Sequence, residues 1–137
     1  MNQPDCVFCK IARGEVPSYK VYEDEKTFAF LDISPVSSGH VLVIPKKHAT
    51  DIFEIEESEW NAVMKTARTI AHTLEKAFAP QGINLVMNNR ALAGQAVFHA
   101  HVHVVPRSED DRYKSWLGKS FSESEGREIA EKIRAAL

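Results

Sequence analysis

The chain has 137 residues, 44% of them hydrophobic and 26% charged, with a formal net charge of −2. This length suits a single hydrophobic core, so we expect one domain over residues 1–137. The weak net charge gives no general attraction to a nucleic-acid polymer or an anionic membrane. The longest apolar runs are too short for a membrane span and the first five residues are polar, so we expect a cytoplasmic protein.

A hairpin is the first element expected, after a turn-rich stretch that follows the two cysteines. Residues 20–23 and 27–32 are rich in aromatic and β-branched side chains and are separated by acidic turn residues. The apolar run at 40–44, ended by Pro45, predicts a central strand. From Ser58 the apolar residues recur three or four positions apart, which predicts one long amphipathic helix.

Two further strands are expected at 83–87 and 97–105. The segment 88–94 between them is too short for a crossover helix, so this pair is predicted to be antiparallel. A last helix is expected to begin at Ser122, with Glu125 completing a capping box. These elements predict an α+β fold, in which a five-stranded antiparallel sheet is combined with one long helix and a C-terminal helix.

Three histidines lie close together at His99, His101 and His103, alternating with apolar residues. Side chains alternate along a strand, so the three imidazoles are expected on one face, with Ala100 and Val102 on the core face. Packing alone rarely places histidines in such a row. Two interpretations are open: a three-histidine metal site, or a nucleophilic imidazole oriented by its neighbours.

Distance favours the second interpretation. Same-face positions of a strand lie about 6.5–7 Å apart, so three rings converge on one ion only if the strand bends. A nucleophilic histidine needs one unprotonated nitrogen, while an acceptor holds the N–H of the other. Gly94, Gln95 and Ala96 precede the row and add backbone N–H groups, which together with Asn88 form a candidate phosphoryl cradle.

Cys6 and Cys9 are the only cysteines, and their C-x-x-C spacing is that of half a tetrahedral zinc site. Two alternatives remain open, a pair of reduced and unligated cysteines and a thioredoxin-like redox pair. The redox pair is disfavoured because no strand is expected before the motif and no helix after it.

The run G-Q-A-V-F-H-A-H-V-H-V-V at 94–105 resembles the signature of the histidine triad (HIT) superfamily. Three other blocks resemble the branch of histidine triad nucleotide-binding proteins and their bacterial relatives: C-V-F-C-K-I-A-R-G-E-V-P at 6–17, F-L-D-I-S-P at 30–35 and G-H-V-L-V-I-P-K-K-H at 39–48. The resemblance covers about residues 6–107, and the tail and helix at 108–137 are less diagnostic.

This resemblance implies a nucleotidyl hydrolase or transferase in which His101 attacks an α-phosphorus and water then hydrolyses the nucleotidyl-histidine. It implies catalytic roles for His99, His101 and His103, a ribose contact for Asp32, and a position near the nucleophile for His40. The nucleotide-binding residues that it implies are Phe8, Phe30, Asp32, Ile33, Asn88, Gly94, Gln95, Ala96, His101 and His103. Of these, Phe8, Phe30 and Ile33 would form the base pocket.

The resemblance also implies a structural Zn²⁺ held by Cys6, Cys9, His48 and His99, which leaves His101 available for chemistry. It implies a homodimer in which two sheets join into one of ten strands, paired through the long helix and the strand near 83–87. Trp116 and Leu117 in the tail either cover the partner's site or pack locally. No metal is expected in the chemical step.

Hydrolysis of nucleoside phosphoramidates or related purine nucleotidyl conjugates is the function that these observations favour. Hydrolysis of a dinucleoside polyphosphate, a nucleotide-binding adaptor with little turnover, and a metallohydrolase are the alternatives. One position departs from the family pattern: Ala96 stands where many relatives carry a hydroxyl residue, which bears on leaving-group preference.

Overall fold

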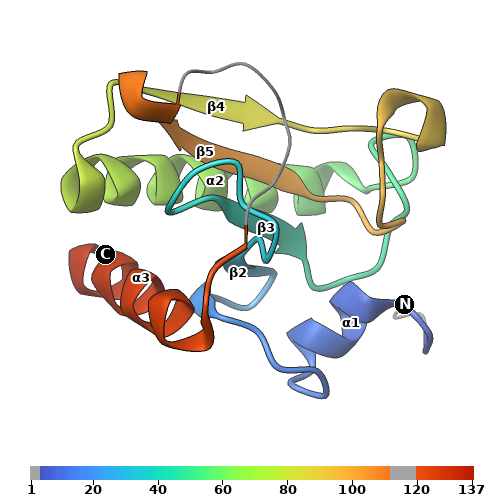
Figure 1. Cartoon of the computed structure of the whole chain (residues 1–137). Coiled ribbons are helices and arrows are strands. Elements are labelled where there is room, and N and C mark those ends of the chain that lie inside the picture. Colours follow the sequence, from blue (N-terminus) through green and yellow to red (C-terminus); the bar gives the residue numbers. More distant parts are fainter. Residues whose placement is uncertain (1–3, 112–119) are drawn as a thin grey trace.

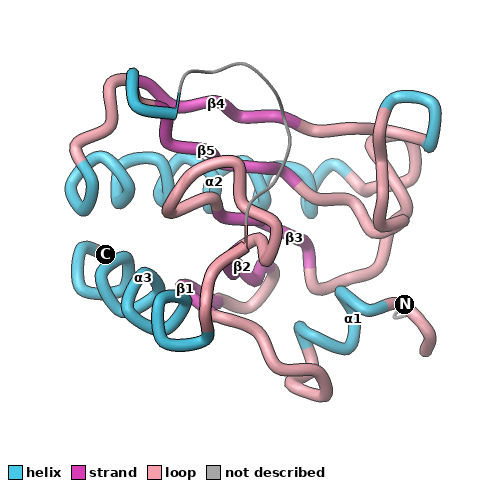
Figure 2. Tube along the Cα trace, viewed as in Figure 1, coloured by secondary structure: helices cyan, strands magenta, loops and turns pink. Residues whose placement is uncertain are grey.

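The computed structural model describes residues 4–111 and 120–137, so Trp116 and Leu117 lie outside the described residues. The described part has the expected α+β class and five-stranded antiparallel sheet, with strand order β1-β2-β3-β5-β4 (Figures 1 and 2). Its elements are α1 (Val7–Ala12), β1 (Lys20–Glu23), β2 (Thr27–Leu31), β3 (Val41–Pro45), α2 (Glu57–Phe78), β4 (Gly82–Val86), β5 (Val102–Arg107) and α3 (Glu123–Ala136), with 3-10 turns at Ala91–Ala93 and Glu109–Asp111.

The two central strands β2 and β3 are buried along their whole length because both faces of the sheet are covered. On one face Ala29, Leu31, Val41 and Val43 pack in the core that includes α2 and α3. The opposite face carries a second cluster, in which Phe28, Phe30, Leu42 and Ile44 pack against Phe8 and Ile11. The alternation of side chains along each strand therefore separates a helix-covered face from the face that carries α1.

Helix α2 covers the sheet with one apolar stripe, and Figure 1 shows it lying along the sheet behind β5. Val63, Ala67, Ile70 and Leu74 repeat at three- and four-residue spacing and are at most 2% exposed. Burying an aliphatic side chain of this size contributes about 1.5–3 kcal/mol. His72 lies on the exposed side of the same helix, as the spacing predicts.

Helix α3 begins with the predicted capping box. The Ser122 hydroxyl accepts from the backbone N–H of Glu125 at 3.2 Å, and the Glu125 carboxylate accepts from the N–H of Ser122 at 2.8 Å. Ile133 is buried against the core, whereas Leu137 at the C-terminus is exposed. No helix in 4–111 or 120–137 is long and apolar enough to cross a lipid bilayer.

Two expectations about the elements are wrong. The strand expected over 97–105 begins only at Val102, because residues 97–101 turn away from the ladder and the N–H of Ala100 donates to the carbonyl of Ala49 at 2.7 Å. A helix does accompany the cysteine pair: α1 starts directly after Cys6 and contains Cys9, whose N–H donates to the Cys6 sulfur. Six residues are too few for helical periodicity to be recognised in the sequence.

Gly126 in α3 allows a close approach that predicts a destabilising substitution. A Cβ at this position would lie 2.6 Å from ring atoms of both Phe121 and Tyr19. Gly126→Ala should therefore lower the free energy of unfolding by about 1–3 kcal/mol, although alanine favours a helix over glycine by about 1 kcal/mol. Urea denaturation measures this change, with Ala135→Gly at an exposed site of the same helix as the comparison. A Gly126→Ala chain as stable as the parent would contradict the close packing.

Candidate active site and metal centre

The three histidines of the row do not act as one ligand group, because the bend at 97–101 sends their side chains to different partners. Among the described residues, His99 groups with Cys6, Cys9 and His48, whereas His103 groups with other side chains near β3. His101 lies between them, its ring centroid 5.1 Å from that of His103. This separation argues against one metal held by all three histidines.

Cys6, Cys9, His48 and His99 bring four possible metal-ligating atoms together. His99 Nδ1 lies 3.3 Å from Cys6 Sγ, 3.5 Å from Cys9 Sγ and 3.2 Å from His48 Nδ1, and Cys9 Sγ lies 3.4 Å from His48 Nδ1. Tetrahedral zinc with Zn–S near 2.3 Å and Zn–N near 2.0 Å places its ligand atoms about 3.3–3.8 Å apart. The four side chains therefore have the donor set and nearly the spacing of a structural zinc site.

The protonation state of His99 also suits a metal. Its Nε2 lies 2.8 Å from the carbonyl oxygen of Pro45. A carbonyl only accepts, so Nε2 carries the hydrogen and Nδ1, which faces the two sulfurs, presents a lone pair. Burial lowers the pKa of His99 to about 4, so the ring is neutral at pH 7.

The same deduction applies to His101. Its Nδ1 lies 2.7 Å from the backbone carbonyl oxygen of His99, so Nδ1 donates and Nε2 is left with the lone pair. The ring is only 6% exposed, and the edge of Phe8 packs against it with centroids 5.2 Å apart. Burial lowers the pKa of His101, which keeps the ring neutral and its Nε2 nucleophilic at pH 7.

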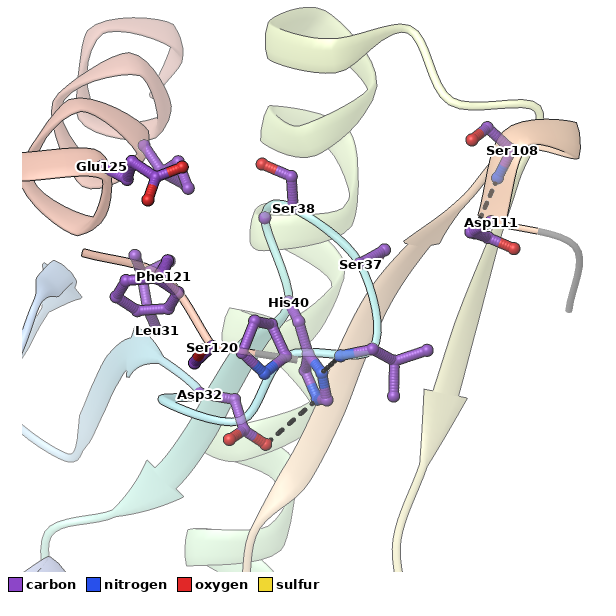
Figure 3. A pocket seen from close by; sticks show the side chains of 14 residues that line it. Leu31, Asp32, Ser37, Ser38, His40, Ser108, Asp111, Ser120, Phe121 and Glu125 are labelled. Atoms are coloured by element: carbon purple, nitrogen blue, oxygen red, sulfur yellow. Dashed lines mark hydrogen bonds and ion pairs between the residues drawn. The ribbon is translucent and has the colours of Figure 1, made fainter. Parts of the chain in front are cut away.

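A chain of directed hydrogen bonds orients His103. The N–H of Val36 donates to His40 Nδ1 at 3.0 Å, which places the hydrogen of neutral His40 on Nε2. That Nε2–H faces His103 Nδ1 at 2.9 Å. The Asp32 carboxylate lies 3.4 Å from the same His40 nitrogen, as Figure 3 shows. His103 Nδ1 is then the acceptor, and its own hydrogen lies on Nε2.

Asp32, His40 and His103 also form a three-residue group whose ligating atoms lie close together. A metal at this group would require a lone pair on His40 Nε2. The hydrogen bond from Val36 to Nδ1 opposes that tautomer. The hydrogen bonds that run from Val36 through His40 to His103, called the relay below, therefore explain these contacts better than a second metal site does.

A cavity of about 490 Å³ brings most of the predicted nucleotide-binding residues together. Its walls include the predicted residues Phe8, Phe30, Asp32, Ile33, Asn88, Gly94, Ala96, His101 and His103. Phe8 and Phe30 are buried and pack edge to face with centroids 5.3 Å apart, while Ile33 is 72% exposed at the rim. The cavity thus has an apolar end and a polar end that holds a carboxylate, an amide and three imidazoles, the third being that of His40.

Gln95 is the one predicted nucleotide-binding residue that does not line this cavity. Its side chain is buried, donating to the carbonyls of Thr50 and Val97 and accepting from the N–H of Arg90. These bonds hold the loop that carries Gly94, which has a φ of +94°. Asn88 lies against Gly94, with its Nδ2 3.7 Å from where a Cβ would stand.

Sequence reasoning missed two kinds of contributor to the site. Ile11, Val16 and Leu42 line the apolar end of the cavity. Ile11 follows Phe8 by one helical turn, a signal that became meaningful only once α1 was known. The N–H of Val36, which sets the tautomer of His40, has no signature in the sequence because it is a backbone group.

The comparisons with known proteins identify the family. A model described as the HIT domain matches residues 13–110, so the chain belongs to the HIT family, as the histidine motif predicts. An uncharacterised HIT-like protein of Mycoplasma genitalium is 49% identical over 104 residues, which cover 76% of this chain and 74% of that protein.

Two longer matches cover nearly all of the chain. The adenosine 5′-monophosphoramidase of Schizosaccharomyces pombe is 35% identical over 135 residues, covering 94% of this chain and 98% of the relative. The crystal structure of a Zn-bound histidine triad family protein from Mycobacterium smegmatis has a TM-score of 0.86 at 34% identity and covers 96% of this chain and 92% of that one. Both matches extend past the motif-bearing region to nearly the whole chain.

The buried relay predicts a loss of stability at acidic pH. Burial lowers the pKa values of His40 and His103 to about 4, below the ordinary value of 6.5. Between these values the unfolded chain binds more protons, so stability is fully present above pH 6.5 and falls as the pH drops toward 4. Each histidine should contribute a slope of up to about 1.4 kcal/mol per pH unit.

Urea denaturation at several pH values from about 7 down to about 4 measures this slope. His103→Asn removes one titrating ring and should reduce the slope, whereas His72→Asn on the exposed side of α2 should not. An unchanged slope in the His103→Asn chain would show that this ring does not titrate as its burial implies.

Proposed function

We propose that this chain is a HIT-family hydrolase that cleaves purine nucleoside phosphoramidates or related nucleotidyl conjugates at the α-phosphate, through a nucleotidyl-histidine on His101. The observation that carries the proposal is the hydrogen bond from His101 Nδ1 to the carbonyl of His99. It leaves Nε2 unprotonated on a ring that lines the same cavity as Asp32 and Asn88.

In the first step His101 Nε2 attacks the α-phosphorus, a P–N bond forms to the ring, and the bond to the leaving amine breaks. The phosphoramidate nitrogen takes up a proton from a solvent water and leaves as the amine, and the nucleotidylated ring becomes positively charged. The carbonyl of His99 accepts the remaining N–H and stabilises that charge. In the second step water attacks the phosphorus, the P–N bond to the ring breaks, and the proton lost by the water passes to solvent, which releases the nucleoside monophosphate and restores neutral His101.

The other site residues bind and orient the nucleotide in this proposal. The base lies between Phe8, Phe30 and Ile33, and Asp32 accepts from the ribose hydroxyls because a carboxylate only accepts. His103 donates through Nε2 to a phosphate oxygen, with Asn88 and the backbone near Gly94 as further donors. Ala96 offers no side-chain donor, so substrates whose leaving group is easily protonated are favoured.

The monophosphoramidase activity named for the Schizosaccharomyces pombe relative supports the phosphoramidate class, because that match covers nearly all of both chains. The same cavity and nucleophile suit an attack on the α-phosphate of a dinucleoside polyphosphate, the second candidate substrate. An adaptor function predicts nucleotide binding with negligible turnover on both classes. Parallel assays with an adenosine phosphoramidate and with diadenosine tetraphosphate separate these three proposals.

Replacing the nucleophile tests the covalent mechanism. His101→Ala should reduce turnover of an adenosine phosphoramidate by about 10³-fold or more, because loss of the nucleophile alone costs about as much as loss of the whole catalytic group. AMP affinity, measured by calorimetry, should stay within a few-fold, because the apolar walls and Asp32 remain. His72→Ala on α2 is the matched control. Trapping with a labelled substrate should modify the parent chain at residue 101, and substantial turnover by His101→Ala would refute the mechanism.

We also propose that Cys6, Cys9, His48 and His99 hold a structural zinc ion, which the Zn-bound Mycobacterium smegmatis relative supports. When bound, the ion would tie the start of α1 to the end of β3 and to the loop before β5. Its ligands include His99 but not His101, so it takes no part in the chemical step. The backbone of His99 would then be held by metal on one side while it orients the nucleophile on the other.

Elemental analysis should find one zinc per parent chain and almost none in Cys9→Ser, while His72→Ala retains it. Chelation should lower the free energy of unfolding by about 4 kcal/mol if free zinc stands a thousandfold above its Kd. Molecules that stay folded after chelation should keep most of their activity. A metal-free parent chain of unchanged stability would contradict the proposal.

We further propose that the protein forms a homodimer with its strand β4 paired to that of a second copy. Strand β4 is an edge strand of the sheet, and its Leu85 is 46% exposed. Exposed edge strands present unpaired backbone groups, which a two-fold copy satisfies by extending the sheet.

A further inference from the structure

A second cavity, of about 340 Å³, lies directly beside the proposed nucleotide cavity. The two cavities share Leu31, Asp32, Val36 and His40 as a common wall. Figure 3 shows Asp32 and His40 on one side of the second cavity and the α3 side chain Glu125 on the other. Since Asp32 is the proposed acceptor for the ribose hydroxyls, the sugar's 2′ and 3′ oxygens would lie at the boundary between the cavities.

The second cavity is lined by hydroxyl and carboxylate groups. Ser37, Ser38, Ser108 and Ser120 supply the hydroxyls, and Asp111 and Glu125 join Asp32 as carboxylates; no Lys or Arg is found among the described residues that line it.

The two outer carboxylates differ in their surroundings. Asp111 is paired with Arg107 at 3.1 Å, which offsets its charge. Glu125 accepts from the backbone N–H of Ser122, and this hydrogen bond lowers its pKa, so the group is ionised at pH 7. The part of the lining that the structure describes therefore favours a neutral or cationic group over a phosphate.

Apolar residues make up the rest of the lining. Leu31, Phe121 and Ile129 contribute hydrocarbon surface between β2 and α3. Phe121 is held in place by Tyr19, with ring centroids 5.3 Å apart. A volume of about 340 Å³ is at the lower end of the range for small-molecule pockets and is enough for one substituent of a nucleotide.

We propose that this cavity is a subsite for an aminoacyl group carried on the 2′ or 3′ oxygen of the bound nucleotide's ribose, with the ammonium group near Glu125 and the serine hydroxyls. The inference rests on the proposed function, because the nucleotide must occupy the first cavity. The acylated ribose keeps one hydroxyl that donates to Asp32. The apolar wall at Phe121 receives the amino-acid side chain.

Calorimetry with three ligands tests this subsite on the full chain. The probe is AMP bearing a 3′-alanylamido group, an amide that resists hydrolysis, compared with AMP and with adenosine 3′,5′-bisphosphate. The alanylamido nucleotide should bind within about threefold of AMP, and the bisphosphate at least about tenfold more weakly, because it places a dianion beside carboxylates. Tighter binding of the bisphosphate than of the alanylamido nucleotide would refute the subsite.

Two lysine substitutions, one inside the second cavity and one outside both cavities, form a matched pair of variants. Ser38→Lys places a cation in the lining of the second cavity. It should lower the affinity for the alanylamido nucleotide about tenfold and raise the affinity for the bisphosphate, while the affinity for AMP stays within about twofold. Ser58→Lys at the start of α2, outside both cavities, should change none of the three. Equal effects of the two variants would refute the subsite.

The failure of this inference is distinguishable from the failure of the proposed function. A parent chain that binds AMP but excludes the alanylamido nucleotide refutes the subsite alone. A parent chain that binds neither AMP nor GMP refutes nucleotide binding, and the subsite falls with it.

Discussion

The hydrogen bond between His101 Nδ1 and the backbone carbonyl of His99, 2.7 Å long, determines what the site can do. Without it either nitrogen of His101 could carry the hydrogen. In the tautomer with the hydrogen on Nε2, that nitrogen would have no lone pair for attack. The peptide that supplies the carbonyl is itself held at three points. The His99 ring bonds Pro45 through Nε2, faces the cysteines through Nδ1, and the next N–H donates to Ala49.

This arrangement depends on the sheet being covered on both faces. Strands β2 and β3 direct alternate residues to the helix face and to the face of α1, so Phe30 and Leu42 reach the cavity while Ala29 and Val43 pack in the core with α2. His103 pairs with Leu42 across the ladder, and Val102 and Val104 belong to the opposite core. The apolar burial on the helix side offsets the cost of placing neutral histidines in the interior of the site.

Much of the fold was predictable because it is encoded locally. The hairpin around Asp24, the long helix and the Ser122 capping box follow from spacing and turn chemistry over a few residues. The candidate metal cluster was not predictable from spacing, since Cys9, His48 and His99 are far apart in the chain and only the family resemblance placed them together.

The incorrect strand boundary has a physical reason. Alternation predicts a straight strand through the histidine row, but the bonds of His99 to Pro45 and of the Ala100 N–H to Ala49 bend the chain before Val102. Such long-range bonds leave no periodic signal. The tautomer relay is hidden for the same reason, because its first donor is the backbone N–H of Val36.

Because the histidines of the relay are neutral, they offer a bound phosphate hydrogen bonds and no positive charge. No Lys or Arg among the described residues lines the nucleotide cavity, and burial keeps His40, His101 and His103 uncharged at pH 7. In the proposed complex a phosphate would meet the N–H dipoles of these neutral rings, and no described lining residue would pair with it as a cation, so its binding should depend weakly on salt. In the proposed mechanism the positive charge develops on the His101 ring after attack, and the nearby Asp32 carboxylate favours that charge. In that mechanism the cavity would stabilise the charged intermediate more than the bound substrate, as transition-state complementarity requires.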